Sequence, residues 1–163
     1  MSLSKTHPIY TSCGNNPYEV LKASTQARYL SGRAKTESLA RHWDPSNKEG
    51  HCRLCWDYQP TLGTIEHLLL PGGCPALADA RLLMLSLFNA YMVNRPYLLP
   101  LLRSCWNICD ELTMQFLLDC STIPIVISET QNNNLPIMSD IFYLTRTYCF
   151  KIFSTRRRLL QTK

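Results

Sequence analysis

Apolar residues return every three or four positions over much of the chain, which is the period of an α-helix with one buried face. The clearest pattern covers residues 75–93, where Pro75 suits the first turn of a helix. Its apolar stripe consists of Leu77, Ala80, Leu83, Met84, Leu87, Phe88 and Tyr91. A second stripe within residues 136–160 consists of Ile137, Ile141, Leu144, Tyr148, Ile152 and Phe153. We therefore expect two long helices that bury these stripes.

Two shorter helices are predicted in the first 45 residues. Asn16 is a favourable N-cap before Pro17, and Ser31-Gly32 is a typical helix end. The expected buried face of this helix consists of Val20, Leu21, Ala23, Ala27 and Leu30. Thr36 can cap a second helix that runs to Trp43.

The second half of the chain is also predicted to be mostly helical. The segment after Pro96 has apolar residues that we expect to be buried, namely Tyr97, Leu98, Leu101, Leu102 and Trp106. Asp110 is expected to cap a helix, whereas residues 121–127 fit either a strand or a helical turn. Because no hairpin signal of the Asn-Gly kind is present, the predicted fold class is mainly α.

Composition narrows the organisation of the chain to one domain, or one domain with a small appendage. Of its 163 residues 45% are hydrophobic and 18% are charged, which excludes disorder throughout. We expect a flexible leader over residues 1–15, a helical segment with a zinc knuckle over 16–95, and a helical segment with a basic tail over 96–163. The densest apolar stretch, Leu82 to Phe88, is short for a membrane helix, and the first residues lack the apolar core of a secretory signal. An intracellular chain, cytoplasmic or nuclear and without a membrane contact, is therefore expected.

Charge is distributed unevenly along the chain. Residues 97–145 carry one Lys or Arg against five Asp or Glu, whereas residues 146–163 carry six Lys or Arg and no acid. Basic residues beside aromatic ones can bind phosphates and stack bases, and here His42 and Trp43 follow a basic segment. The candidate nucleic-acid-binding residues are Arg28, Arg33, Lys35, Arg41, Arg53, Lys151, Arg156, Arg157 and Arg158. A solvated helix end for residues 156–158 and core packing for Trp43 remain alternatives.

The eight cysteines favour metal binding over disulfides, because no secretory signal directs the chain to an oxidising compartment. Cys52 and Cys55 form a C-x2-C pair that continues as C-x2-C-x11-H-x6-C through His67 and Cys74. Three thiolates and one imidazole are a common tetrahedral donor set for zinc, and four protein ligands leave no open catalytic position. Thr64 can cap a short helix that carries His67.

A different ligand and a redox-active cysteine pair are the alternatives to this zinc site. His51 is a competing ligand next to Cys52, and a redox-active C-x2-C pair would need a βαβ context that the sequence does not show. The cysteines outside the motif are expected to be small buried apolar residues, namely Cys105, Cys109, Cys120 and Cys149.

The cysteine segment also resembles a known family. The runs Cys52-Arg53-Leu54-Cys55, Gly63 to Leu70 and Cys74-Pro75-Ala76-Leu77 with Arg81 are similar to the zinc-binding segment in the C-terminal region of non-LTR retrotransposon (LINE-type) reverse transcriptases. The run Ala27 to Arg33 resembles the helix that precedes this segment in the family. The likeness covers residues 20–90, and it departs from the family at Pro71-Gly72-Gly73 and at Gly63. It implies a piece of a reverse transcriptase polyprotein, or a protein derived from one.

Catalytic motifs of such elements are missing from the sequence. Polymerase chemistry needs paired aspartates that hold two metals, and no Asp-Asp pair occurs. We therefore expect a non-catalytic, zinc-stabilised module that binds RNA or DNA, with the remainder of a polyprotein as a further partner. The alternative is a structural or protein-interaction domain in which zinc only stabilises the fold.

Overall fold

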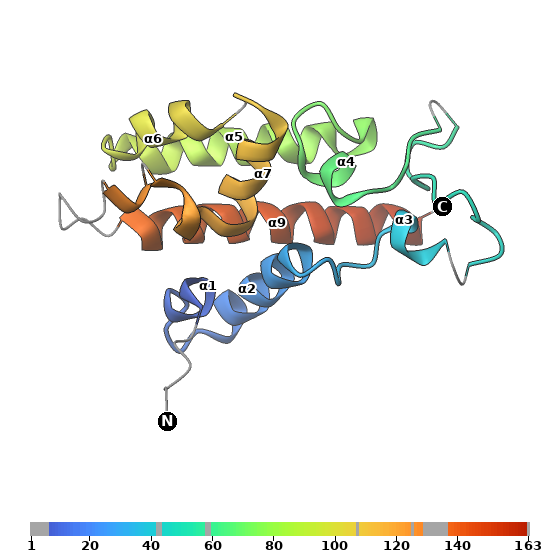
Figure 1. Ribbon diagram of the computed structural model, residues 1–163, viewed down its shortest axis with the longest axis horizontal. Helices are drawn as coiled ribbons and strands as arrows, with labels where there is room; N and C mark the ends of the chain where they lie inside the picture. The colour runs from blue at the N-terminus through green and yellow to red at the C-terminus, as the bar shows by residue number, and fades with distance from the viewer. Residues whose placement is uncertain are drawn as a thin grey trace.

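The computed structural model describes residues 7–41, 44–57, 60–106, 108–124, 126–128 and 137–162 (Figure 1). The described residues form no strand, and His51 and Leu62 pair in an isolated antiparallel bridge. The mainly α fold class is confirmed. The elements are α1 (Pro8–Thr11), α2 (Pro17–Leu30), α3 (Glu37–Ala40), α4 (Ile65–Leu69), η1 (Pro75–Leu77), α5 (Ala78–Val93), α6 (Leu98–Cys105), α7 (Asp110–Asp119), η2 (Cys120–Thr122) and α9 (Ile137–Gln161).

The long helix α9 is the centre of the fold. Figure 1 shows it running through the middle of the molecule, with α5 and α6 on one side and α1 and α2 on the other, and it packs on α2, α5 and α7. The predicted stripe is buried at Ile137, Ile141, Leu144, Tyr148 and Ile152, as expected. The predicted first residue, Pro136, lies outside the described residues.

Helix α2 has the predicted bounds but buries only part of the predicted face. The Asn16 side chain accepts a hydrogen bond from the Tyr18 amide, which confirms the N-cap. The predicted apolar face is buried at Ala23 and half-buried at Ala27, but Val20, Leu21 and Leu30 are exposed. Fully buried Gln26 instead donates hydrogen bonds to the Leu117 carbonyl and the Thr145 hydroxyl, so polar contacts hold α2 on its neighbours.

Helix α5 and the preceding turn η1 replace the single helix predicted over 75–93. The stripe is buried at Leu77, Ala80, Met84 and Phe88, but Leu83 and Leu87 are exposed. By length and composition the stretch Pro75–Val93 could also cross a membrane, against the sequence-based expectation, although the core helix of a soluble protein meets the same criteria.

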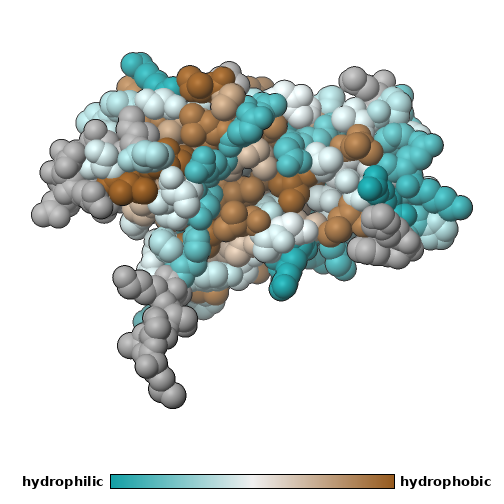
Figure 2. All heavy atoms as spheres, in the orientation of Figure 1, coloured by the Kyte–Doolittle hydropathy of each residue, from teal (hydrophilic) through white to brown (hydrophobic). Residues whose placement is uncertain are grey.

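Figure 2 shows apolar side chains gathered across the middle of one face and polar ones at the end near the C-terminus.

The shorter segments correct several local predictions. Of the expected leader, residues from His7 onward are described, and they form α1 with Ile9 buried. Cys109 rather than Asp110 is the N-cap of α7. Residues 120–122 and 126–128 are helical, which resolves the ambiguous segment in favour of helix. The division of the chain near residue 95 stays a prediction.

Candidate metal centre and basic pocket

The four predicted metal ligands come together in one cluster. The ligand atoms of Cys52, Cys55, His67 and Cys74 all lie within 4.8 Å of one another. The Sγ atoms of Cys52 and Cys74 are 3.8 Å apart, and Cys55 Sγ lies 3.3 Å from His67 Nε2. A sulfur–sulfur distance of 3.8 Å is far longer than a disulfide bond. The three thiols are buried and the imidazole is half-buried, so this donor set can hold a metal ion.

Local sequence places His67 and Cys74 side by side. Thr64 caps α4 as predicted, because its hydroxyl accepts a hydrogen bond from the His67 amide at 3.2 Å. The chain then turns back, and the Cys74 amide donates to the His67 carbonyl at 2.6 Å. A Cβ at Gly73 would lie 2.2 Å from that carbonyl oxygen, so only glycine fits at this turn.

The backbone that follows His67 is held by α5 and α9. Buried Arg81 of α5 donates hydrogen bonds to the carbonyls of Leu68 and Cys74, at 3.3 and 2.5 Å. The hydroxyl of Tyr148 in α9 donates to the Leu69 carbonyl. The last carbonyls of a helix have no partner within the helix, so these side chains supply the missing donors. The cluster is therefore fixed to both long helices.

The three thiols affect one another's ionisation. The hydrogen bond from Cys74 lowers the pKa of Cys52 well below its usual value. The pKa of Cys55 is raised by burial and by the charge of Cys52, and the pKa of Cys74 is raised by its hydrogen bond with Cys52 and by burial. Three adjacent thiolates repel one another without a cation, and a bound metal ion would compensate that charge.

The remaining metal-ligand candidates lie away from this cluster. His51 packs its ring on Trp56 with ring centroids 5.0 Å apart, and its Nδ1 lies 3.0 Å from a carboxylate oxygen of Glu49. His51 is not among the clustered ligands. The predicted burial of the other cysteines is confirmed at Cys105, Cys120 and Cys149 but is wrong at Cys109, which is exposed because it precedes α7.

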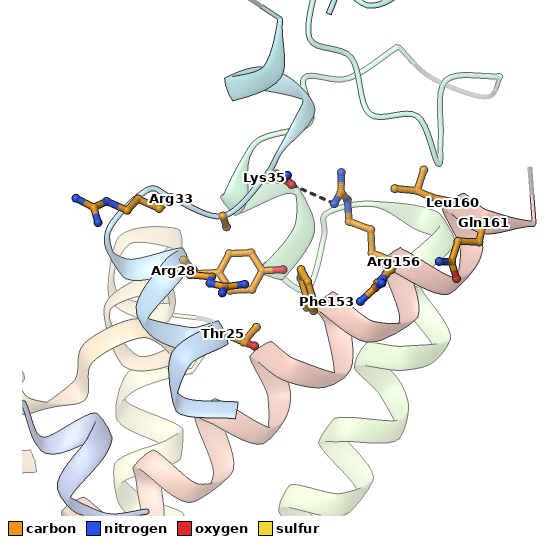
Figure 3. A pocket seen from close by; sticks show the side chains of 11 residues that line it. Thr25, Arg28, Arg33, Lys35, Phe153, Arg156, Leu160 and Gln161 are labelled. Atoms are coloured by element: carbon orange, nitrogen blue, oxygen red, sulfur yellow. Dashed lines mark hydrogen bonds between the residues drawn. The ribbon is translucent and has the colours of Figure 1, made fainter. Parts of the chain in front are cut away.

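A second feature is a pocket of about 640 Å³ between α2 and α9 (Figure 3). It brings together cations that the sequence places in two separate groups, one from residues 28–35 and one from residues 156–157. Among the described residues, no acidic side chain lines it. The lining residues are Thr25, Arg28, Tyr29, Arg33, Ala34, Lys35, Phe153, Arg156, Arg157, Leu160 and Gln161.

The turn after α2 shapes one side of this pocket. Gly32 adopts a left-handed conformation with φ of 67°, which glycine tolerates best. The amides of Arg33 and Ala34 then both donate to the Arg28 carbonyl, at 2.8 and 2.9 Å. The chain is thereby folded back, so that Arg33 and Lys35 return to the end of the helix that carries Arg28.

Apart from Arg156, the predicted nucleic-acid-binding residues divide into three groups. Arg28, Arg33, Lys35 and Arg157 are exposed at the pocket, and their side chains form no hydrogen bond or ion pair with the described residues. Exposed Arg41 and Arg158, and half-buried Lys151, do not line it. Arg53 pairs with Asp44 on another part of the surface. His42 and Trp43 lie outside the described residues.

Two arginines of α9, one of them the predicted nucleic-acid-binding residue Arg156, form ion pairs. Arg156 donates to Glu37 at 2.6 Å and to the Lys35 carbonyl at 3.1 Å, and the Arg156 and Glu37 side chains are 11% and 5% exposed. Arg146 is buried and pairs with Glu19 at 2.7 Å. The sequence analysis missed these pairs because each joins residues more than a hundred positions apart.

Sequence reasoning also missed the apolar part of the pocket. Phe153 packs against the core, as predicted, but it is only half-buried and also projects from α9 into the space between the two helices (Figure 3). Tyr29 lies within a run that the sequence analysis used only for family likeness. The alternation of aromatic and basic residues at 28–29 and 153–157 is the signal that was available.

Comparison with known proteins gives no relative, since no protein-family profile, curated protein or solved structure matches this chain.

Proposed function

We propose that this chain is a non-catalytic nucleic-acid-binding module whose fold is stabilised by zinc. One observation carries the proposal: basic residues from two distant segments, 28–35 and 156–157, line one pocket together with aromatic side chains. Lys35 and Arg156, 121 positions apart, line the same pocket. Cations next to aromatic rings are the groups that bind phosphates and stack bases.

Zinc is the metal that the cluster fits best. Ligands at zinc–sulfur and zinc–nitrogen distances lie about 3.6–3.8 Å apart at the corners of a tetrahedron. The observed separations of 3.8 Å between two thiols and 3.3 Å between thiol and imidazole are close to these values. Thiolate ligands with one imidazole favour zinc over harder cations such as magnesium or calcium. Four protein ligands complete its coordination, so the zinc has a structural role.

The resemblance to the zinc-binding region of LINE-type reverse transcriptases supports the same proposal. Arg81, which belongs to the resembling run, donates hydrogen bonds to the Leu68 and Cys74 carbonyls. A piece of such a polyprotein, or a protein derived from one, would need a nucleic-acid contact but no catalytic centre of its own. The proposal therefore includes the remainder of a polyprotein as a partner.

A protein-interaction domain is the second candidate, and a specific observation favours it. Leu82, Leu83 and Leu87 of α5 are 65%, 47% and 47% exposed, and Val93 at the helix end is 78% exposed. Neighbouring exposed apolar side chains on one helix are typical of a surface that another protein covers.

Binding of the metal-loaded chain to labelled RNA and DNA, titrated with salt, distinguishes the two candidates. A module that contacts several phosphates loses affinity steeply as salt rises, since binding releases counterions. The double variant Arg28→Gln with Arg33→Gln should weaken binding. Its control, Arg41→Gln with Arg158→Gln, removes equal charge outside the pocket and should bind normally. Weak binding with no salt slope would favour the interaction domain.

A further inference from the structure

The shape of the basic pocket is relevant to the kind of nucleic acid it can bind. It is a hollow with apolar side chains in its lining, namely Ala34, Phe153 and Leu160, rather than a flat basic face. A duplex keeps its bases stacked inside and presents phosphates and groove edges. The stacked bases of a duplex cannot contact the apolar lining of this hollow. An unpaired base, by contrast, can enter the hollow and stack there.

The charges are arranged around this hollow. Arg28, Arg33 and Lys35 come from one side, Arg157 comes from α9, and no described residue neutralises any of them. Phe153 is half-buried: its side chain packs against the core and also lines the pocket, and the aromatic pairs of the described residues do not include it. If one unpaired base enters the pocket, the phosphates that flank it on either side would lie close to cations on both sides of the pocket.

We propose that this pocket binds single-stranded nucleic acid, with one unpaired base against Phe153 and the flanking phosphates on Arg28, Arg33, Lys35 and Arg157. The proposal rests on the proposed function and names its ligand class. RNA and DNA strands share this chemistry, since the stacked face and the phosphates are common to both.

Arg156 has a different role in the same pocket. Its guanidinium donates hydrogen bonds to Glu37 and to the Lys35 carbonyl, so its charge is compensated and its position is fixed. Figure 3 shows the contact with Lys35. Arg156 therefore positions Lys35 beside the hollow and does not contact the strand. A lining that is ordered before binding loses less entropy when the strand arrives.

The experiment compares three probes on the metal-loaded full chain by fluorescence anisotropy. The probes are oligouridylate and oligothymidylate of about ten nucleotides and a duplex of equal length. Phe153→Leu keeps an apolar side chain but removes the ring, and it should weaken single-strand binding at least about fivefold, since a stacked base contributes that much. Duplex binding should not change.

Arg157→Gln and Arg158→Gln form the matched pair for the charges. Both residues are exposed neighbours on α9, but only Arg157 lines the pocket. Arg157→Gln should weaken single-strand binding and reduce its salt slope by about 0.7, whereas Arg158→Gln should do neither. Exposed Arg157 also keeps the test valid if Phe153→Leu fails to fold. Thermal unfolding of each variant checks its fold.

Each result has one meaning. If neither Phe153→Leu nor Arg157→Gln changes single-strand binding, the pocket assignment is overturned, while the proposed function stands. If Phe153→Leu weakens the binding of duplex and of single strand equally, the pocket assignment is also overturned. Failure of the chain to bind any of the three probes would instead overturn the proposed function. If both variants lose affinity for oligouridylate and for oligothymidylate, the result supports the proposal. The ratio of the two affinities tells whether RNA or DNA is preferred.

Discussion

The metal cluster takes its ligands from one stretch whose members are at most 22 positions apart, whereas the basic pocket joins residues separated by 121 positions. The cluster is closed, because its thiols are buried and its backbone is fixed by Arg81 and Tyr148. The pocket is open, and four of its cations have no described partner. The proposed metal site is thus built locally and its backbone is satisfied internally, whereas the proposed nucleic-acid site keeps four charges without a described partner.

Removing one cluster ligand should have the largest effect on stability. Cys55→Ser deletes a thiolate, and structural zinc contributes about 10–16 kcal/mol of binding free energy in zinc-finger peptides, more than most domains have in total stability. We expect loss of the metal in native mass spectrometry and loss of the cooperative thermal transition in circular dichroism. Cys109→Ser, at an exposed position, should leave both unchanged. Equal behaviour of the two variants would show that the ligands are misassigned.

The two neighbouring arginines of α9 should separate stability from binding. Arg156→Gln leaves the buried carboxylate of Glu37 without its partner, which we expect to cost about 3 kcal/mol of unfolding free energy. Arg157→Gln changes an exposed residue and should cost less than about 0.5 kcal/mol. Urea denaturation measures both. The alternative of a solvated helix end for residues 156–158 does not hold at Arg156, because its side chain is paired with Glu37. Similar values for both variants would contradict a structural role for Arg156.

A smaller loss of stability is expected where α9 holds the metal segment. Tyr148→Phe removes the donor to the Leu69 carbonyl and leaves that buried acceptor unpaired, at about 1–2 kcal/mol. Metal affinity, measured by competition with a chelating dye, should fall with it. Tyr18→Phe is the control, since Tyr18 is 54% exposed. A stable Tyr148→Phe protein with normal metal affinity would mean that α9 does not support the cluster.

The smallest effect concerns one pocket cation. Lys35→Gln should leave unfolding unchanged, because the Arg156 contact uses the Lys35 carbonyl and not its side chain. It should lower the salt slope of single-strand binding by about 0.7, one phosphate contact. Lys48→Gln removes the same charge at an exposed position outside the pocket and should not change the slope. A slope that falls equally in both variants would indicate a diffuse electrostatic effect.

The features that sequence predicts well are those encoded within a few residues. The Asn16 and Thr64 caps and the spacing from Cys52 to Cys74 are local, because each depends on backbone groups or side chains that neighbouring residues place. The long stripe of α9 was also predictable, since burial of one whole face leaves a regular period.

The remaining features depend on partners distant in the chain. The buried face of α2 was partly misassigned because Gln26 finds its acceptors at Leu117 and Thr145, which no local pattern reveals. The same reason applies to Arg156, whose charge looks exposed until Glu37 is placed beside it. The pocket itself could not be predicted, because each half supplies only part of its lining.

One close contact joins the two sites. Glu37, the partner of Arg156, packs so tightly on Gly63 that a Cβ there would lie 2.5 Å from a Glu37 carboxylate oxygen. The Ser38 amide also donates to the Gly63 carbonyl, and Gly63 directly precedes the residue that caps the His67 helix. If metal binding orders this path, it raises the affinity of the pocket for its ligand. Thermodynamic reciprocity then requires that a bound strand raise the affinity of the cluster for its metal by the same factor, so the nucleic acid would help the protein to retain its metal.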